Sequence, residues 1–138
     1  MRSYRETFDV CTRRKREVVD ITETIRQACR GSGVRDGLCL VFPHHTSSAV
    51  YVSDSDRHLT DDLLDALARA VPEGEGYAHN RVDPKMNAEA HLMAVLAGHH
   101  ILLPVSDGDL DLGLYQTIYY AEFDGCRPKG VLVKVVGE

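Results

Sequence analysis

The stretch GLCLVFPHHTSSAVYVS, residues 37–53, decides the fold class of this chain. Gly37–Phe42 is a compact apolar run bounded by Gly and Pro, which predicts a buried central strand. Ala49–Ser53 resumes an extended pattern with Val, Tyr and Val, so it predicts a second strand. The polar segment between these strands is too short to form the crossover connection that parallel neighbours need, so we expect antiparallel sheets.

The rest of the chain predicts about three helices and several more strands. Helical spacing of apolar residues, together with capping and stop signals, predicts helices over about Thr22–Arg30, over about Arg57–Ala70, and between Asn87 and Gly98. The remaining elements are a hairpin formed by Tyr4–Cys11 and Arg16–Ile21, a loop over Tyr77–Met86, and strands at Ile101–Val105, Leu110–Leu114, Gln116–Phe123 and Val131–Val136. We therefore expect an α+β fold of mostly antiparallel sheets in a single compact domain, residues 1–138.

Composition excludes several classes of protein. Sixteen basic and 21 acidic side chains give a net charge of -5, which argues against general nucleic-acid binding. No run of about 18 apolar residues exists and the first residues lack the apolar segment of a signal peptide, so we expect a cytoplasmic protein that does not bind membranes. The cysteines are widely spaced with no Cys-x-x-Cys pair, and we expect small buried hydrophobes at Cys11, Cys29, Cys39 and Cys126.

Three histidines are the main candidates for chemistry. His45 stands before Thr46 and Ser47 at the end of the buried strand, while His79 and His91 fall on the loop and on the third helix. Imidazole is a common metal ligand and moves protons near neutral pH, so three converging rings would make a reaction centre. The local sequence alone is equally compatible with a polar loop at 45–48 and with structural hydrogen bonding by the other two histidines.

Four further polar residues are weaker candidates. Asp54 directly follows the second strand of the opening stretch and could face the same pocket as His45. Gln116 and Glu122 are an even number of residues apart, so they would share one face of a strand. Arg127 follows a turn and could bind an anion.

Several short motifs occur together in a fixed order and carry a family resemblance. They are Pro43-x-His45-Thr46-Ser47, Tyr77-x-His79, Ala90-His91, Gly98, Leu112-Gly113-x-x-Gln116 and Glu122-Phe123-Asp124-Gly125-x-Arg127. In this order the chain resembles the YjbQ family, whose members are described as secondary thiamine-phosphate synthases. The chain departs from the family pattern at Ser53-Asp54-Ser55, where the usual acid is Glu, and at Tyr115, where the usual residue is Trp.

The resemblance implies a homotrimer whose pocket is lined by His45, His79 and His91. These histidines, with Asp54, would be catalytic, and the histidines could hold a divalent metal such as zinc or magnesium. Residues expected to contact a phosphorylated small molecule are Thr46, Ser47, Tyr115, Gln116 and Arg127. The implied reaction couples hydroxymethylpyrimidine diphosphate to thiazole phosphate. The alternatives are a non-catalytic trimer that binds a phosphorylated metabolite or metal, and a metal-dependent hydrolase.

Overall fold

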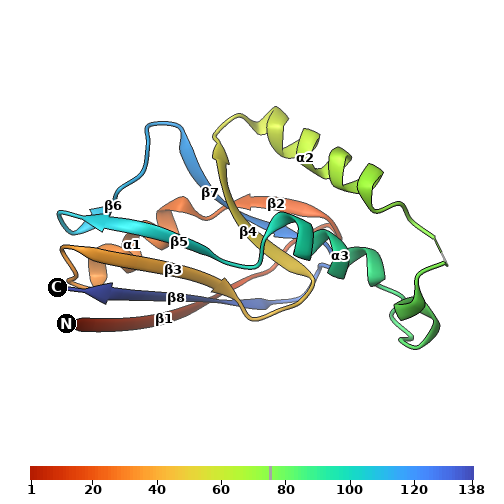
Figure 1. Cartoon of the computed structure of the whole chain (residues 1–138), viewed down its shortest axis with the longest axis horizontal. Helices are drawn as coiled ribbons and strands as arrows, with labels where there is room; N and C mark the ends of the chain where they lie inside the picture. Colours follow the sequence, from red (N-terminus) through yellow and green to blue (C-terminus); the bar gives the residue numbers. More distant parts are fainter. Residues whose placement is uncertain (75) are drawn as a thin grey trace.

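The computed structural model describes residues 1–74 and 76–138 as two antiparallel sheets with helices at their edges (Figure 1). The larger sheet has five strands in the order β1-β8-β3-β5-β6. These strands are β1 (Arg2–Val10), β8 (Lys129–Gly137), β3 (Gly37–Pro43), β5 (Ile101–Ser106) and β6 (Asp109–Leu110). Both ends of the chain lie at the same end of this sheet, where the Met1 amino group is 3.3 Å from Glu138.

The smaller sheet has three strands in the order β2-β7-β4, namely β2 (Glu17–Asp20), β7 (Gln116–Glu122) and β4 (Ser48–Asp54). In the pairing of β4 with β7, Ser48 lies opposite Glu122 and Asp54 lies opposite Gln116. Six residues separate these two ends, which is about 20 Å at the rise of a strand. The smaller sheet therefore has two well-separated ends.

The main core lies between the two sheets, and strand alternation creates it. In β8 the side chains of Val131, Val133 and Val135 are fully buried, while the residues between them are partly or fully exposed. Ile118 and Tyr120 of β7 enter the same core from the smaller sheet. Helix α1 (Thr22–Gly31) closes it with a face that buries Ile25, Ala28 and Cys29.

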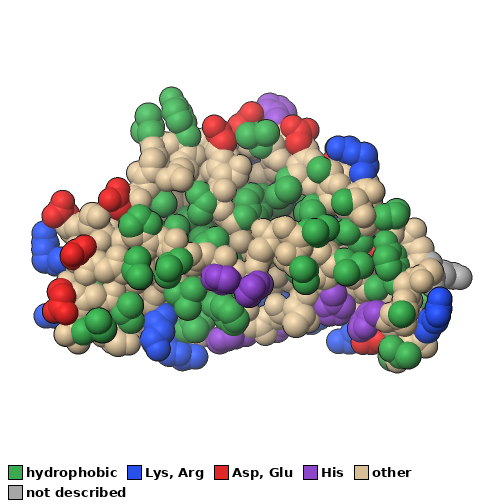
Figure 2. Space-filling model, viewed as in Figure 1, with side chains coloured by type: hydrophobic (Ala, Val, Ile, Leu, Met, Phe, Trp, Pro, Cys, Tyr) green, Lys and Arg blue, Asp and Glu red, His purple; other side chains and the backbone are tan. Residues whose placement is uncertain are grey.

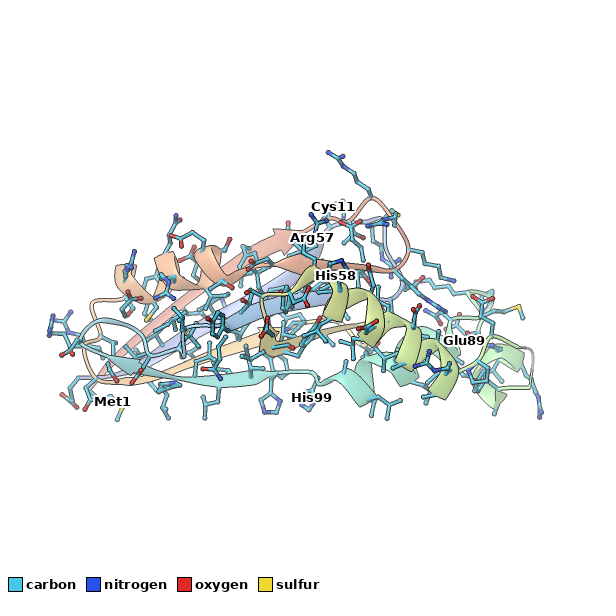
Figure 3. All side chains as sticks on the ribbon, turned by 90° about the horizontal axis from the view of Figure 1, so that it is seen from above. Met1, Cys11, Arg57, His58, Glu89 and His99 are labelled. Carbon is cyan, nitrogen blue, oxygen red and sulfur yellow. The ribbon has the colours of Figure 1, made fainter. Side chains whose placement is uncertain are left out.

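Two helices beside β4 contribute to a second apolar cluster. Helix α2 (Arg57–Ala70) begins at Asp56, whose carboxylate accepts a hydrogen bond from the His58 amide. Helix α3 (Ala88–Ala97) packs on β4 and contributes Ala90, Met93 and Ala94 to the cluster. The short 3-10 helix η1 (Ala78–Arg81) precedes α3 at the end of the molecule away from the chain termini, and in Figure 3 Glu89 and Met1 mark these opposite ends.

The expected α+β class with antiparallel sheets is confirmed, but four local predictions are wrong. β1 and β2 do not form a hairpin, because β1 pairs with β8 and β2 pairs with β7 in the other sheet. Of the strand expected at 110–114 only β6 forms, and the expected loop at 77–86 contains η1. Cys29 and Cys39 are buried as expected, whereas Cys11 and Cys126 are exposed.

None of the helices in the described residues is long and apolar enough to cross a membrane.

Candidate functional site

His79 and His91 form the centre of the candidate site. η1 carries His79 and the first turn of α3 carries His91, and their rings lie edge to face with centroids 4.9 Å apart. The Nδ1 atom of His91 is 3.0 Å from the Thr46 carbonyl oxygen. A carbonyl oxygen can only accept, so this nitrogen carries the proton and the Nε2 atom of His91 remains uncommitted.

Asn87 fixes the other ring. Its side chain is buried, and its Nδ2 atom donates to the Asp124 carboxylate at 2.9 Å. The Oδ1 atom of Asn87 therefore faces His79 and accepts a hydrogen bond from Nε2 at 3.0 Å, which leaves the Nδ1 atom of His79 uncommitted. Each ring of the pair thus uses one nitrogen to hold its position and keeps one for a ligand.

Arg127 joins this network through Asp124. Its guanidinium lies 3.7 Å from the Asp124 carboxylate and also donates to the Asp124 carbonyl oxygen at 3.3 Å. Burial of Asp124 raises its pKa, but the hydrogen bond from Asn87 and the charge of Arg127 outweigh this effect and lower the pKa overall. The expected anion-binding arginine is therefore connected to the histidine pair through two side chains.

A cavity of about 500 Å³ opens beside the pair. Its lining is mostly apolar, with Tyr77, Ala88 and Leu92 among its walls, and few polar atoms reach it. Its full lining is Thr46, Tyr77, Ala78, His79, Ala88, His91 and Leu92. An organic molecule with one polar group fits this combination of walls.

His45 lies in the neighbouring cavity, not with the pair. Its Nε2 atom accepts a hydrogen bond from the Gly130 amide at 3.2 Å, so its proton is on Nδ1 when the ring is neutral. The cavity beside it measures about 520 Å³ and shares Thr46 with the first. Burial lowers the pKa of His45, and the charge of Lys129 lowers it further, with smaller effects from Arg127 and His44, while Glu122 opposes them.

The predicted metal centre does not fit this geometry. Within residues 1–74 and 76–138, no group of three His, Cys, Asp or Glu side chains is arranged to hold a metal ion. The physical reason is that His45 turns toward the amide of Gly130, so only His79 and His91 meet face to edge. In the described residues of a single chain, His45, His79 and His91 therefore do not converge as one metal site.

Asp54, Tyr115 and Gln116 lie elsewhere. β4 and β7 carry Asp54 and Gln116 to the far end of the smaller sheet, about 20 Å from Ser48 and Glu122. The Asp54 carboxylate accepts from the amide of Asp56, Gln116 accepts from the Gly113 amide at 2.7 Å, and Tyr115 is largely exposed. The expectation that these three residues line the histidine pocket is wrong for a single chain, because the length of the strands separates them.

Thr46 and Ser47 lie where they were expected, between β3 and β4, but they play different parts. Thr46 is exposed, lines both cavities and holds His91 through its carbonyl oxygen. Ser47 is buried, and its hydroxyl accepts a hydrogen bond from the Lys129 ammonium at 2.8 Å. Ser47 therefore supports the loop and does not line either cavity.

Sequence reasoning missed the roles of Asn87, Asp124 and Lys129 in holding the site, and it singled out Glu122 only as sharing a strand face with Gln116. Asn87 was expected only as a helix cap, yet it makes no capping bond, and the Asn80 side chain accepts from the Ala88 amide in its place. Asp124 was taken as a turn residue. Its position in the ordered motif that ends at Arg127 was the available signal.

Comparison with known proteins agrees with the fold. A family model described as "UPF0047 protein YjbQ-like" matches residues 6–138. A UPF0047 protein of Archaeoglobus fulgidus is 40% identical over 125 residues, which cover 91% of this chain and 95% of the relative. A UPF0047 protein of Methanothermobacter thermautotrophicus is 36% identical over 138 residues, 100% of this chain and 95% of the relative.

A solved structure is also similar. The YbjQ-like protein of unknown function from Sulfolobus solfataricus superposes with a TM-score of 0.93 at 34% identity, over 99% of this chain and 98% of that chain. The expected thiamine-phosphate synthase activity is wrong on these findings, because the matched proteins are described only as UPF0047 or as of unknown function. The findings support neither this transfer reaction nor the metal-dependent hydrolysis considered as an alternative. The fold, the ordered motifs and the match over residues 6–138 together place the chain in the UPF0047 (YjbQ-like) family.

Proposed function

We propose that this protein binds a small phosphorylated molecule in the cavity beside His79 and His91. The observation that carries the proposal is the histidine pair itself, with rings 4.9 Å apart on a cavity of about 500 Å³. Each ring has one nitrogen held by the protein and one free to contact a ligand. Two converging imidazoles with fixed orientation are suited to hold an anionic group.

A phosphate ester is the anion that suits this pair. It carries a charge of about -1.5 to -2 near neutral pH and offers three strong acceptor oxygens. A bound phosphate dianion would stabilise the protonated form of either ring, so each uncommitted nitrogen would become an N–H donor toward a phosphate oxygen. The apolar side chains of Tyr77, Ala88 and Leu92 would then contact the organic part of the ligand.

Calorimetric titration with phenyl phosphate tests the proposal, with phenol as the uncharged control. We expect saturable binding of phenyl phosphate and at least tenfold weaker binding of phenol. His91→Ala should lower the affinity for phenyl phosphate by about tenfold or more with a small change in Tm, because His91 is partly exposed. Equal binding of both probes, or a large loss of Tm with unchanged affinity, would contradict the proposal.

We also propose that the protein assembles as a homotrimer. The support is a set of exposed apolar side chains on α3 and on the outer face of β3 and β5. Hydrophobic side chains and histidines intermix on this side of the molecule (Figure 2). The set comprises Leu38, Leu92, Val95, Leu96 and Leu102.

A further inference from the structure

A fully buried ion pair lies directly behind the candidate site. Lys129 begins β8 and Glu122 ends β7, and neither side chain is exposed to solvent. The Lys129 ammonium is 2.5 Å from the Oε2 atom of Glu122. The pair therefore joins the five-stranded sheet to the three-stranded sheet at the end of the molecule that carries the histidines.

Both charged groups of this pair have several hydrogen-bond partners. Glu122 also accepts from the Tyr120 hydroxyl at 2.9 Å and from the Asp124 amide at 3.1 Å. Lys129 also donates to the Ser47 hydroxyl at 2.8 Å. Both carboxylate oxygens and two of the three N–H groups of the ammonium thus have partners, and such bonding is what allows two charges to remain buried.

Stability alone does not account for the pair. Removing two charges from water is costly, and replacing a buried ion pair by apolar side chains of similar volume is often neutral or stabilising. The surrounding core is apolar, with Val131, Ile118 and Phe123 all fully buried. An apolar pair at 122 and 129 would extend this core, so the charged pair calls for another explanation.

The contacts of the pair lead to each of the three histidines. Ser47 follows Thr46, whose carbonyl oxygen holds His91. Gly130 follows Lys129, and its amide donates to His45. The Asp124 amide is bonded to Glu122, and the Asp124 side chain holds Asn87 and through it His79.

We propose that Lys129 and Glu122 are positioning residues, which fix the three segments holding His45, His79 and His91 in one arrangement. The inference rests on the proposed function for its purpose, because the arrangement matters only if the cavity binds a ligand. The pair does not touch the ligand itself. Lys129 fixes the position of the His45-Thr46-Ser47 loop through Ser47, and Glu122 fixes the position of the Asp124 turn through the Asp124 amide.

The decisive experiment compares single and double replacements of the pair. Lys129→Met and Glu122→Leu alone each leave a buried charge without a partner, and each should lower Tm by more than about 10 °C. The double variant Lys129→Met/Glu122→Leu removes both charges and should recover most of this loss. A double variant that stays stable separates the positioning role from the structural one.

The readout is the set of imidazole signals in a long-range ¹H–¹⁵N NMR spectrum, which needs no ligand. In the unmodified protein, at a pH where the rings are neutral, we expect both His45 and His91 to carry the proton on Nδ1. In the double variant we expect these single tautomers to be lost and the affinity for phenyl phosphate to fall about tenfold. Recovered stability with unchanged histidine signals and unchanged affinity would overturn the proposal.

Two further variants complete the test. Ser47→Ala removes only the hydrogen bond from Lys129 to the histidine loop, so it tests the positioning role even if the double variant does not fold. Shifted His45 and His91 signals in this variant support the proposal, and unchanged signals overturn it. Arg30→Gln on α1 breaks an ion pair with Asp109 of β6 and should leave the signals of all three histidines unchanged. If unmodified protein binds no phenyl phosphate, the proposed function fails, while the histidine signals still test the positioning role.

Discussion

At the scale of single residues, the role of each histidine is set by its hydrogen-bond partner. His79 is held by a side chain, His91 by a backbone carbonyl and His45 by a backbone amide. The last contact requires a bare ring nitrogen, while the first two require a protonated one. The sequence shows three similar residues, but the fold makes them chemically different.

Replacement of Asn87 should lower both the stability of the protein and its affinity for the ligand. Asn87→Ala leaves a buried region without the amide that joins His79 to Asp124. We expect the free energy of unfolding to fall by about 1–3 kcal/mol, because buried partners lose their hydrogen bonds. Urea denaturation measures this loss, and Gln116→Ala, an exposed amide at the far end of β7, is the matched control with a change below about 0.5 kcal/mol. Equal effects of the two substitutions would refute the bridging role.

His45 should make stability depend on pH. Burial and nearby positive charge lower its pKa in the folded protein, so the unfolded chain binds more protons between the folded pKa and about 6.5. Stability should therefore rise with pH through this window and be lost as the pH falls toward the folded pKa. Tm measured from pH 5 to 8 should rise more steeply for the unmodified protein than for His45→Gln. Parallel curves would show that His45 does not contribute.

At the scale of elements, the extent of individual helices and strands was predictable but their partners were not. The apolar period and the flanking Asp and Pro predict the helix over Arg57–Ala70, which is where α2 forms. Alternation likewise predicts the strand containing Val131–Val136. No local pattern shows that β1 pairs with β8, which lies 119 or more positions along the chain, because pairing is decided by the packing of the two sheets.

The candidate site was predictable to the same degree. His45, Thr46 and Ser47 were placed correctly at the end of β3, since a strand end can be read from the sequence. The meeting of His79 with His91 depends on the path of the segment before α3, and the buried pair of Glu122 and Lys129 depends on contact between sheets. Both are tertiary effects that short-range periodicity does not encode.

The turn between β7 and β8 offers a test at this scale. The Gly125 amide donates to the Lys15 carbonyl oxygen, and a Cβ atom on Gly125 would lie 2.6 Å from the Arg14 carbonyl oxygen. Gly125→Ala should therefore destabilise the protein by about 1–3 kcal/mol through overpacking of the two connections. Gly31→Ala is the control, because a Cβ atom there meets nothing within 4 Å. Urea denaturation of both variants checks the difference, and similar midpoints would contradict the close contact.

At the scale of the whole molecule, the candidate site occupies one end and the chain termini occupy the other (Figure 3). The sheet face that carries Leu38 and Leu102 runs between them and remains uncovered in the single chain. A chain of this size gains stability when such a face is buried against further copies.

Assembly is therefore open to a direct test. Light scattering should give three times the chain mass of 15.3 kDa at micromolar concentration. Leu102→Glu places a charge on the exposed face of β5 and should shift the mass toward that of one chain, since a buried unpaired carboxylate opposes association. Arg30→Gln, on α1, should leave the mass unchanged. A monomeric mass for the unmodified protein would refute the trimer.

The central claim concerns where a phosphorylated molecule binds. The most direct measurement is an NMR titration of the imidazole signals with phenyl phosphate, because the histidines report on separate parts of the molecule. We predict saturable shifts of His79 and His91 with one common affinity, and no shift of His58, which is exposed on α2. Equal shifts of His58 and the pair, or no shift of the pair at millimolar phenyl phosphate, would contradict the account.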